Sequence, residues 1–251
     1  MSELPHYYSS LTPFREVFLT GQPVLTYHHV GRRKRGARLK GLYVSTRLFV
    51  RQMKELKAAG YESGRFEDFV GGQYGSQNRI HLTFDDGFSD VFENALPVLR
   101  EHGFAGIQFL VSDLLGKTNE WQQREGDVIE KLMDEVQIRD WLKAGQQIGA
   151  HTATHPRLTQ VSLTAAREEI VGSKKALEDR FGVPVENFCY PYGDWNETVR
   201  DLVIDAGYKT AFTTITGVNK AGESLFELRR FTARYPTRSF KSVWKALKPK
   251  V

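Results

Sequence analysis

Short runs rich in β-branched and aromatic residues alternate with helical patterns along most of this 251-residue chain. Strands are predicted at residues 23–30, 79–84, 106–111, 147–150, 187–190, 210–214 and 225–231. Helices are predicted between them, at residues 46–59, 90–101, 138–143, 162–181 and 196–206. A helix between two strands lets the second strand run in the same direction as the first, so such strands pair in parallel. The alternation therefore predicts an α/β fold built on a parallel sheet.

Capping and helix-breaking residues mark the ends of several predicted helices. Thr46 is expected to cap the first helix and Asn196 the last one before residue 206. Pro97 must lie near a helix start or kink the helix that contains it. Residues 112–125, which include Trp121, show no regular pattern and are expected to form a lid or a substrate loop.

Polar residues come at the ends of four predicted strands. They are His28, the pair Asp85 and Asp86, His151, and the Tyr-Pro-Tyr segment at residues 190–192. In a barrel of parallel strands the carboxyl ends share one face, and that face holds the active site. The placement of these residues therefore predicts a barrel with its chemistry at one end.

The composition fits one soluble globular domain. Hydrophobic residues make up 40% and charged residues 26% of the chain, and no apolar run approaches the roughly 18 residues that cross a bilayer. No linker divides the chain, so we expect an N-terminal extension at residues 1–22 and a single domain at residues 23–251. No signal peptide pattern is visible, which predicts a cytoplasmic location. Cys189 is the single cysteine, so an intrachain disulfide and a cysteine-rich zinc site are both excluded.

Basic residues are concentrated at residues 32–40. The chain has a formal net charge of +5, and Arg32, Arg33, Lys34 and Arg35 are consecutive. No sequence pattern of a nucleic-acid-binding fold accompanies them, so a nucleic-acid partner is not expected. The favoured interpretation is a solvated loop flanked by glycines. Contact with an anionic substrate, such as a phosphorylated or uronic-acid sugar, is the alternative.

Two segments carry a set of metal ligands. His151 and His155 are four residues apart, and Asp85 and Asp86 are adjacent at a predicted strand end. A catalytic zinc site takes about three protein ligands and keeps one position open for water. One aspartate can complete such a set with the two histidines, while the other accepts a proton from the water. Surface histidines and an Asp-Gly turn are the alternatives, and the combination favours metal-assisted hydrolysis.

The motifs around these residues resemble those of the polysaccharide deacetylase family, also called the NodB-homology or carbohydrate esterase family 4 domain. They are Thr-Phe-Asp-Asp-Gly at 83–87, His-Thr-Ala-Thr-His-Pro at 151–156 and Phe-Cys-Tyr-Pro-Tyr-Gly at 188–193. The resemblance extends over residues 24–231. It implies a single-domain, distorted (β/α)7 barrel that uses a divalent metal to hydrolyse N-acetyl groups on sugars.

The resemblance also implies roles for individual residues. Asp85 corresponds to the general base, and Asp86, His151 and His155 correspond to the metal ligands. Tyr192 lies in the third motif, where a backbone N–H helps to stabilise the oxyanion of the tetrahedral intermediate. Zinc is the expected ion, with cobalt, nickel or iron(II) as alternatives.

The chain departs from the family pattern at two places. Cys189 stands where the third motif usually has an arginine that steadies the catalytic aspartate. Arg230 either replaces that arginine from another strand end or is an exposed charge. The family's C-terminal motif with the catalytic histidine is absent after Phe231, but Leu-Thr-Tyr-His-His at residues 25–29 resembles it. This is similar to the permuted branch of biofilm poly-N-acetylglucosamine deacetylases, and it makes His28 the expected general acid.

Substrate contacts are expected next to the third motif. Tyr190, Pro191 and Trp195 are predicted to bind substrate, together with Arg230. Trp121 and Trp195 can stack on a sugar ring, although ordinary packing is the alternative for both.

The sequence therefore predicts a metal-dependent hydrolase that removes an N-acetyl or similar acyl group from an amino sugar, an oligosaccharide or a glycan precursor, which can be anionic. Two alternatives stay open. One is a hydrolase of small non-sugar amides on the same fold, and the other is a catalytically inactive carbohydrate-binding module.

Overall fold

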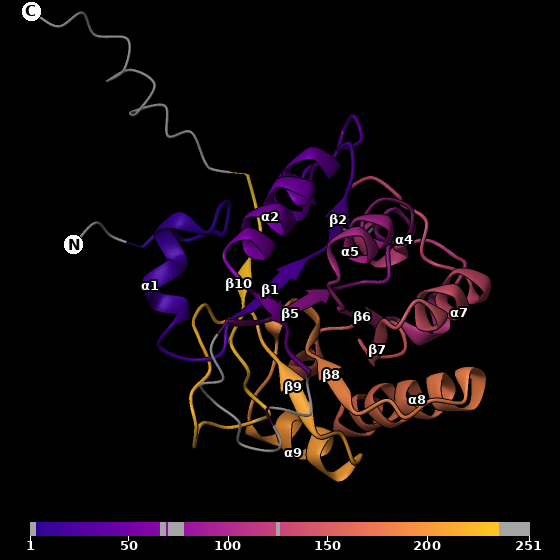
Figure 1. Ribbon diagram of the computed structural model, residues 1–251. Helices are drawn as coiled ribbons and strands as arrows, with labels where there is room; N and C mark the ends of the chain where they lie inside the picture. The colour runs from indigo at the N-terminus through magenta and orange to yellow at the C-terminus, as the bar shows by residue number, and fades with distance from the viewer. Residues whose placement is uncertain (1–3, 66–68, 70–77, 124–125, 236–251) are drawn as a thin grey trace, which may run out of the picture.

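Seven parallel strands form the centre of the computed structural model, which describes residues 4–65, 69, 78–123 and 126–235 (Figure 1). They are β1 (Val24–Tyr27), β5 (Arg79–Phe84), β6 (Ile107–Leu110), β7 (Gln147–Ala150), β8 (Asn187–Cys189), β9 (Thr210–Phe212) and β10 (Phe231–Thr232). Their order in the sheet is β10-β1-β5-β6-β7-β8-β9, and each neighbouring pair is parallel. In addition, β4 (Glu62–Ser63) pairs with β5, and β2 (His29–Val30) pairs with β3 (Tyr43–Val44).

The sheet curls into a barrel, and an irregular segment bridges its two edge strands. Leu228 donates its N–H to Ala211 on β9, while Phe231 three residues later pairs with Leu25 on β1. This is the predicted distorted (β/α)7 barrel of a single α/β domain, and the fold prediction is confirmed. The strand predicted over residues 225–231 is wrong for most of its length. The side chain of Asn219 bonds both the N–H and the C=O of Arg229, so a strand partner cannot take those groups.

Helices surround the sheet (Figure 1). The longer ones are α2 (Thr46–Ala58), α4 (Ser89–Asn94), α5 (Leu96–His102), α7 (Glu135–Lys143), α8 (Leu163–Phe181) and α9 (Glu197–Asp205). Short turns of helix are α1 (Arg15–Phe18), α6 (Glu120–Gln123) and the 3-10 turns η1 (Thr12–Phe14), η2 (Lys40–Leu42), η3 (Ser112–Leu114), η4 (Leu158–Gln160) and η5 (Pro191–Gly193).

Most predicted helices are present, and the differences occur at their ends. The cap of α2 is Ser45, whose hydroxyl accepts the N–H of Leu48, and not Thr46, which is already helical. Pro97 lies in the first turn of α5 and separates it from α4, because a proline in a helix interior removes a hydrogen bond and clashes with the preceding turn. Asn196 caps α9 as predicted. A capping box on Asp134 starts α7 three residues before the predicted start.

The N-terminal residues that the structure describes pack against the barrel. The ring centroids of Phe14 and Phe18 lie 5.4 and 5.3 Å from that of Phe231. The predicted domain boundary at residue 23 stays a prediction, and the part of the predicted domain after Tyr235 lies outside the described residues.

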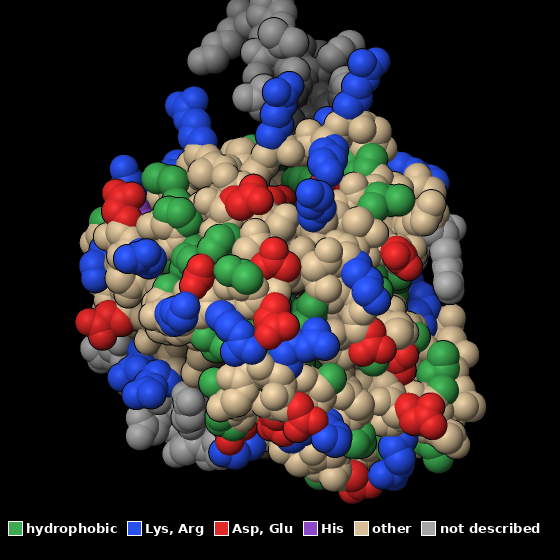
Figure 2. Space-filling model, turned by 90° about the vertical axis from the view of Figure 1, so that its right-hand side faces the viewer, with side chains coloured by type: hydrophobic (Ala, Val, Ile, Leu, Met, Phe, Trp, Pro, Cys, Tyr) green, Lys and Arg blue, Asp and Glu red, His purple; other side chains and the backbone are tan. Residues whose placement is uncertain are grey.

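The surface over α4, α7 and α8 carries mixed charge. Figure 2 shows acidic and basic side chains interspersed there with single hydrophobic ones, while lysine and arginine side chains project at its upper end. None of the described helices is long and apolar enough to cross a membrane.

Candidate active site

The polar residues that end four strands meet at one end of the barrel. His28 follows β1, Asp85 and Asp86 follow β5, and His151 follows β7. Because all these strands are parallel, their carboxyl ends form one face. Both aspartates and His151 are buried, whereas the side chain of His28 keeps 19% of its surface exposed.

Asp86 converges with the two histidines of the second motif. Its Oδ1 lies 3.3 Å from Nε2 of His151 and 3.3 Å from Nε2 of His155. One ligand atom from each of the three residues lies within 4.8 Å of the others. Two nitrogens and one carboxylate oxygen form the donor set of a catalytic zinc-type site with room for a further ligand.

The hydrogen bonds of His151 are compatible with a cation in this cluster. Its Nδ1 lies 2.7 Å from the backbone oxygen of Cys189, which can only accept, so Nδ1 carries the hydrogen. In a neutral ring Nε2 then has a lone pair, and this lone pair faces the carboxylate of Asp86. A divalent ion between these atoms would satisfy both. Orientation of a ligand histidine by a backbone carbonyl is common at metal sites.

The loop that carries the histidines is tightly held. Thr152 and His155 have positive φ angles of 67° and 68°, and Asp86 has a φ of 74°. Such angles are strained for residues other than glycine and are retained where the surrounding structure enforces them. Here the carboxylate of Glu169 on α8 accepts two backbone N–H groups of the loop, from Ala153 and Thr154, each at 2.8 Å.

Asp85 is paired with Arg230. The guanidinium makes a two-pronged contact with the carboxylate, at 2.7 and 2.8 Å. Burial acts to raise the pKa of Asp85, but the charge and the hydrogen bonds of Arg230 outweigh it and hold this pKa below its ordinary value. Asp85 is therefore a carboxylate at neutral pH.

Arg230 corrects two expectations. The side chain is buried, so its interpretation as an exposed charge is wrong. Its Nε and two terminal nitrogens make five contacts, to the oxygens of Asp85, Thr83 and Thr213 and to the sulfur of Cys189. Because an arginine has five N–H groups, none remains for the predicted contact with substrate. Arg230 instead supplies a guanidinium to Asp85, as the first of the two sequence-based interpretations predicts.

The two consecutive histidines after β1 have different surroundings. Nε2 of His28 lies 3.8 Å from Oδ2 of Asp85, and burial lowers the pKa of His28 below its ordinary value. His29 is buried, its Nδ1 lies 3.0 Å from Asp90, and its ring stacks between Tyr43 and Phe88. His29 is therefore part of the support for this end of the barrel.

Besides Cys189, the third motif brings Tyr192 close to the metal-type cluster. Tyr192 has a φ of 61°, and its ring centroid lies 4.7 Å from that of His155. Tyr190 is buried and donates its hydroxyl to Phe226, so it packs in the core and does not face a ligand. Trp195 stacks on the ring of Tyr190. The oxyanion role of Tyr192 and the substrate contacts of Pro191 and Trp195 stay predictions.

The three sequence motifs do not predict two further contacts at the site, one between two aromatic rings and one between a guanidinium and a ring. The ring of Trp121 stacks on His155 with centroids 4.4 Å apart, a partner that the sequence does not identify. The guanidinium of Arg157 lies 3.9 Å from the centre of the Tyr192 ring. These four side chains line a pocket of about 700 Å³ beside the cluster. Arg157 could be suspected only because it directly follows the second motif.

Known proteins resemble the chain in both sequence and fold. A family model described as Polysaccharide deacetylase matches residues 72–211, which is more than half of the chain. YxkH of Bacillus subtilis is 24% identical over 212 residues, covering 83% of this chain and 70% of YxkH. Peptidoglycan-N-acetylglucosamine deacetylase PgdA of Listeria monocytogenes is 28% identical over 129 residues, covering 51% of this chain but only 24% of PgdA.

A solved structure extends the similarity to the fold. BC0361, a polysaccharide deacetylase from Bacillus cereus, is 29% identical and superposes with a TM-score of 0.73. The superposition covers 91% of this chain and 69% of BC0361.

Proposed function

Since this chain belongs to the polysaccharide deacetylase family, we propose that it removes the N-acetyl group from an amino sugar of a glycan or glycan precursor, with the help of a divalent metal ion. The observation that carries this proposal is the separation of two neighbouring acids. Asp86 converges with two imidazoles, whereas Asp85 is held as a carboxylate by Arg230. Zinc is the ion proposed first, and cobalt, nickel and iron(II) suit the same donors.

The two acids are proposed to have different tasks. Asp86, His151 and His155 would hold the ion, which when bound polarises the acetyl carbonyl and lowers the pKa of water. Asp85 is ionised beside this cluster, so it can accept a proton from the attacking water.

His28 is proposed to protonate the leaving nitrogen. Its Nε2 lies 3.8 Å from Asp85, and its lowered pKa keeps the ring neutral before the reaction. The ring can therefore receive the proton that Asp85 takes from water. Transfer of that proton to the nitrogen allows the C–N bond to break, which leaves acetate and a free amine. The backbone N–H of Tyr192 is proposed to stabilise the oxyanion formed on the way.

The name of PgdA supports an N-acetylated hexosamine as the substrate, since that protein is a peptidoglycan N-acetylglucosamine deacetylase. The contact between Arg230 and Asp85 also weakens the inactive-module alternative. The best support for that alternative is that Cys189 stands where the third motif usually has an arginine, and Arg230 supplies a guanidinium to Asp85.

The test is the release of acetate and free amine from N-acetylglucosamine oligomers by the zinc- or cobalt-loaded protein. We expect equal amounts of both products, no release by His151→Ala, and release about 100-fold slower in His28→Ala with its metal retained. Release from small amides but from no N-acetylated sugar would support the small-amide hydrolase. A metal-loaded protein that binds the oligomers without releasing acetate would support the inactive module.

A further inference from the structure

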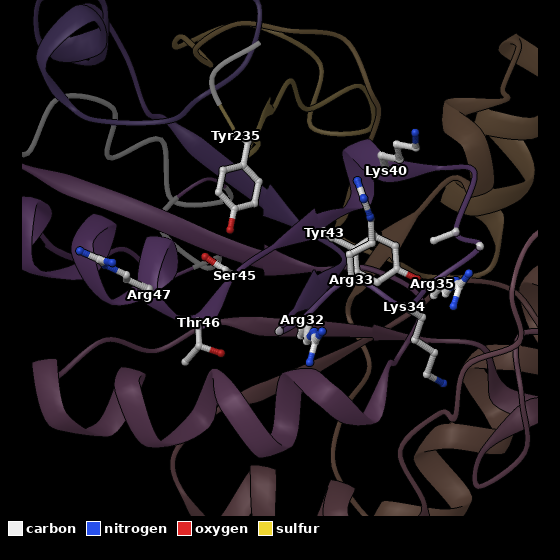
Figure 3. Close-up of a pocket in the computed structure, with 13 residues that line it drawn as sticks. Arg32, Arg33, Lys34, Arg35, Lys40, Tyr43, Ser45, Thr46, Arg47 and Tyr235 are labelled. Atoms are coloured by element: carbon white, nitrogen blue, oxygen red, sulfur yellow. The ribbon is translucent and has the colours of Figure 1, made fainter. Parts of the chain in front are cut away.

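Basic side chains surround a pocket between the loop after β2 and the start of α2 (Figure 3). The pocket has a volume of about 1240 Å³. Its basic lining residues are Arg32, Arg33, Lys34, Arg35, Lys40 and Arg47. In Figure 3 the cations of the loop lie on one side and Arg47 lies on the other, with Ser45 and Thr46. No acidic side chain is among the described residues that line this pocket.

The nearby acids hold the loop in place and leave the pocket cationic. The carboxylate of Asp127 accepts the N–H groups of Arg38 and Leu39, both at 2.8 Å. Glu130 forms an ion pair with Lys34 and accepts the hydroxyl of Tyr43. Both acids are therefore engaged in fixing the conformation of the loop.

The remaining cations are concentrated without counter-charges. Within the described part of the chain, no carboxylate oxygen pairs with Arg32, Arg33, Arg35, Lys40 or Arg47. These side chains are exposed, and like charges that line one pocket repel one another. A loop that is only solvated could spread these side chains apart. This loop instead is tied to β3 and to Asp127, so it keeps the charges around one pocket.

The start of α2 adds to the positive potential of the pocket. Thr46 and Arg47 form the first helical positions, and the cap Ser45 uses its hydroxyl for the N–H of Leu48. The amino end of a helix carries a partial positive charge that favours anions. Arginine forks match the paired oxygens of a phosphate or a carboxylate. A diphosphate carries more negative charge than a single carboxylate, so it can engage more of the six cations at once.

The pocket lies close to the candidate general acid along the chain. Gly31 lines the pocket and follows His28 by three residues, so their Cα atoms are at most about 11 Å apart. A sugar at the active site that carries a phosphate or diphosphate group can span this separation. The volume also exceeds the roughly 300–1,000 Å³ of most small-molecule pockets, which leaves room for more than one phosphate.

We propose that this pocket binds the phosphate groups of the substrate, so that the amino sugar to be deacetylated is linked to a phosphate or diphosphate. The inference rests on the proposed function and narrows its substrate class. It takes up the alternative that the sequence offers for residues 32–40, which is contact with an anionic substrate.

The first test measures binding without turnover. Inorganic diphosphate is titrated calorimetrically into the wild type and into the triple variant Arg32→Gln/Arg33→Gln/Arg35→Gln. The matched control is Lys143→Gln/Arg167→Gln/Lys175→Gln, which removes three exposed cations from α7 and α8 and gives the same net charge. We expect the dissociation constant to rise at least about 10-fold in the pocket variant alone. The inference would be overturned by equal affinities for diphosphate in all three proteins, or by an equal loss of that affinity in both variants.

The second test compares the KM for two N-acetylated probes, UDP-N-acetylglucosamine and a neutral N-acetylglucosamine oligomer. In the pocket variant we expect the KM for the diphosphate-bearing probe to rise about 10-fold more than that for the neutral one, while the control variant shows no such preference. Release of acetate from both probes with no such difference would overturn the inference but not the proposed function. Acetate release from no N-acetylated sugar, with diphosphate binding dependent on the pocket, would instead show that the proposed function has failed.

A lipid surface is a second source of phosphate, and vesicles distinguish it. Binding to phosphatidylglycerol vesicles that is lost in the pocket variant, with an unchanged affinity for inorganic diphosphate, would assign the pocket to a membrane surface. That result would overturn the proposal of a phosphate-linked sugar.

Discussion

At the scale of single residues, two adjacent aspartates have different surroundings. Asp86 faces two imidazoles, and Asp85 faces a guanidinium whose five N–H groups all contact the protein. Neighbouring residues on an extended chain point in different directions, and the positive φ of Asp86 turns its side chain further. One acid can therefore bind an ion while the other stays available for a proton.

Replacement of Arg230 by alanine should impair both activity and stability. Asp85 would stay buried without its guanidinium, and its pKa would rise because the largest effect that opposes burial is then lost. We expect acetate release to fall by about 100-fold and its acid limb to move to higher pH. The free energy of unfolding should fall by about 3–5 kcal/mol. Steady-state rates against pH and urea unfolding measure these effects.

A second substitution should rescue this variant. The sulfur of Cys189 lies 3.7 Å from Asp85 and 3.2 Å from Arg230, so an arginine at residue 189 can reach the same carboxylate. We expect Cys189→Arg to restore much of the activity that Arg230→Ala loses, whereas Cys189→Ala in the same background restores none. Equal rates with and without the new arginine would show that Arg230 does more than balance the charge of Asp85.

At the scale of elements, the start of α2 shows how a cap can be misassigned by one residue. Ser45 and Thr46 are both good capping residues, and sequence favours neither strongly. In the structure Ser45 is extended and accepts the N–H of Leu48. Ser45→Ala should therefore lower the free energy of unfolding by about 1 kcal/mol, and Thr46→Ala by clearly less. Thermal or urea unfolding measures both, and a larger loss in Thr46→Ala would contradict the observed cap.

The site motifs could be predicted because each is local in sequence and follows a strand. Asp85, Asp86 and His151 all end strands with clear patterns, and parallel pairing brings strand ends together. Arg230 could be suggested but not placed, because it lies in an irregular segment whose hydrogen bonds come from Asn219 and Ile215. Glu169 could not be found, since its contact with the histidine loop depends on how α8 packs.

For the basic loop, the sequence correctly predicts exposed residues but cannot show the pocket that they line, for a related reason. Its charge is evident from sequence, but its rigidity comes from Asp127 and Glu130, almost ninety residues away along the chain. Only the fold shows that these acids are engaged with the loop and that the remaining cations share one pocket.

At the scale of the whole molecule, His81 makes the stability of the fold depend on pH. Its side chain is fully buried on β5 and is paired with Gln22. Burial, with a smaller effect from Arg79, lowers the pKa of His81 to about 3, against about 6.5 in an unfolded chain. The unfolded state therefore binds the proton more readily, and stability is lost as the pH falls from 6.5 towards 3.

The size of this dependence can be measured from the slope of the unfolding free energy against pH, in the wild type and in His81→Gln. His81 should contribute about 1.4 kcal/mol of unfolding free energy per pH unit between pH 4 and 6. In His81→Gln this contribution is absent, so the fall in stability over that range should be shallower by about that amount. Urea unfolding at several pH values gives both slopes. Equal slopes in the two proteins would show that His81 is not held neutral by its surroundings.

The central claim is that one acid holds the ion and its neighbour accepts the proton. The most direct measurement is the divalent metal content per chain together with acetate release, for the wild type, Asp85→Asn and Asp86→Asn. We predict about one ion per chain in the wild type. Asp85→Asn should keep this ion and release acetate at least about 100-fold more slowly, whereas Asp86→Asn should lose both. Equal loss of metal in the two variants would contradict the separation of roles.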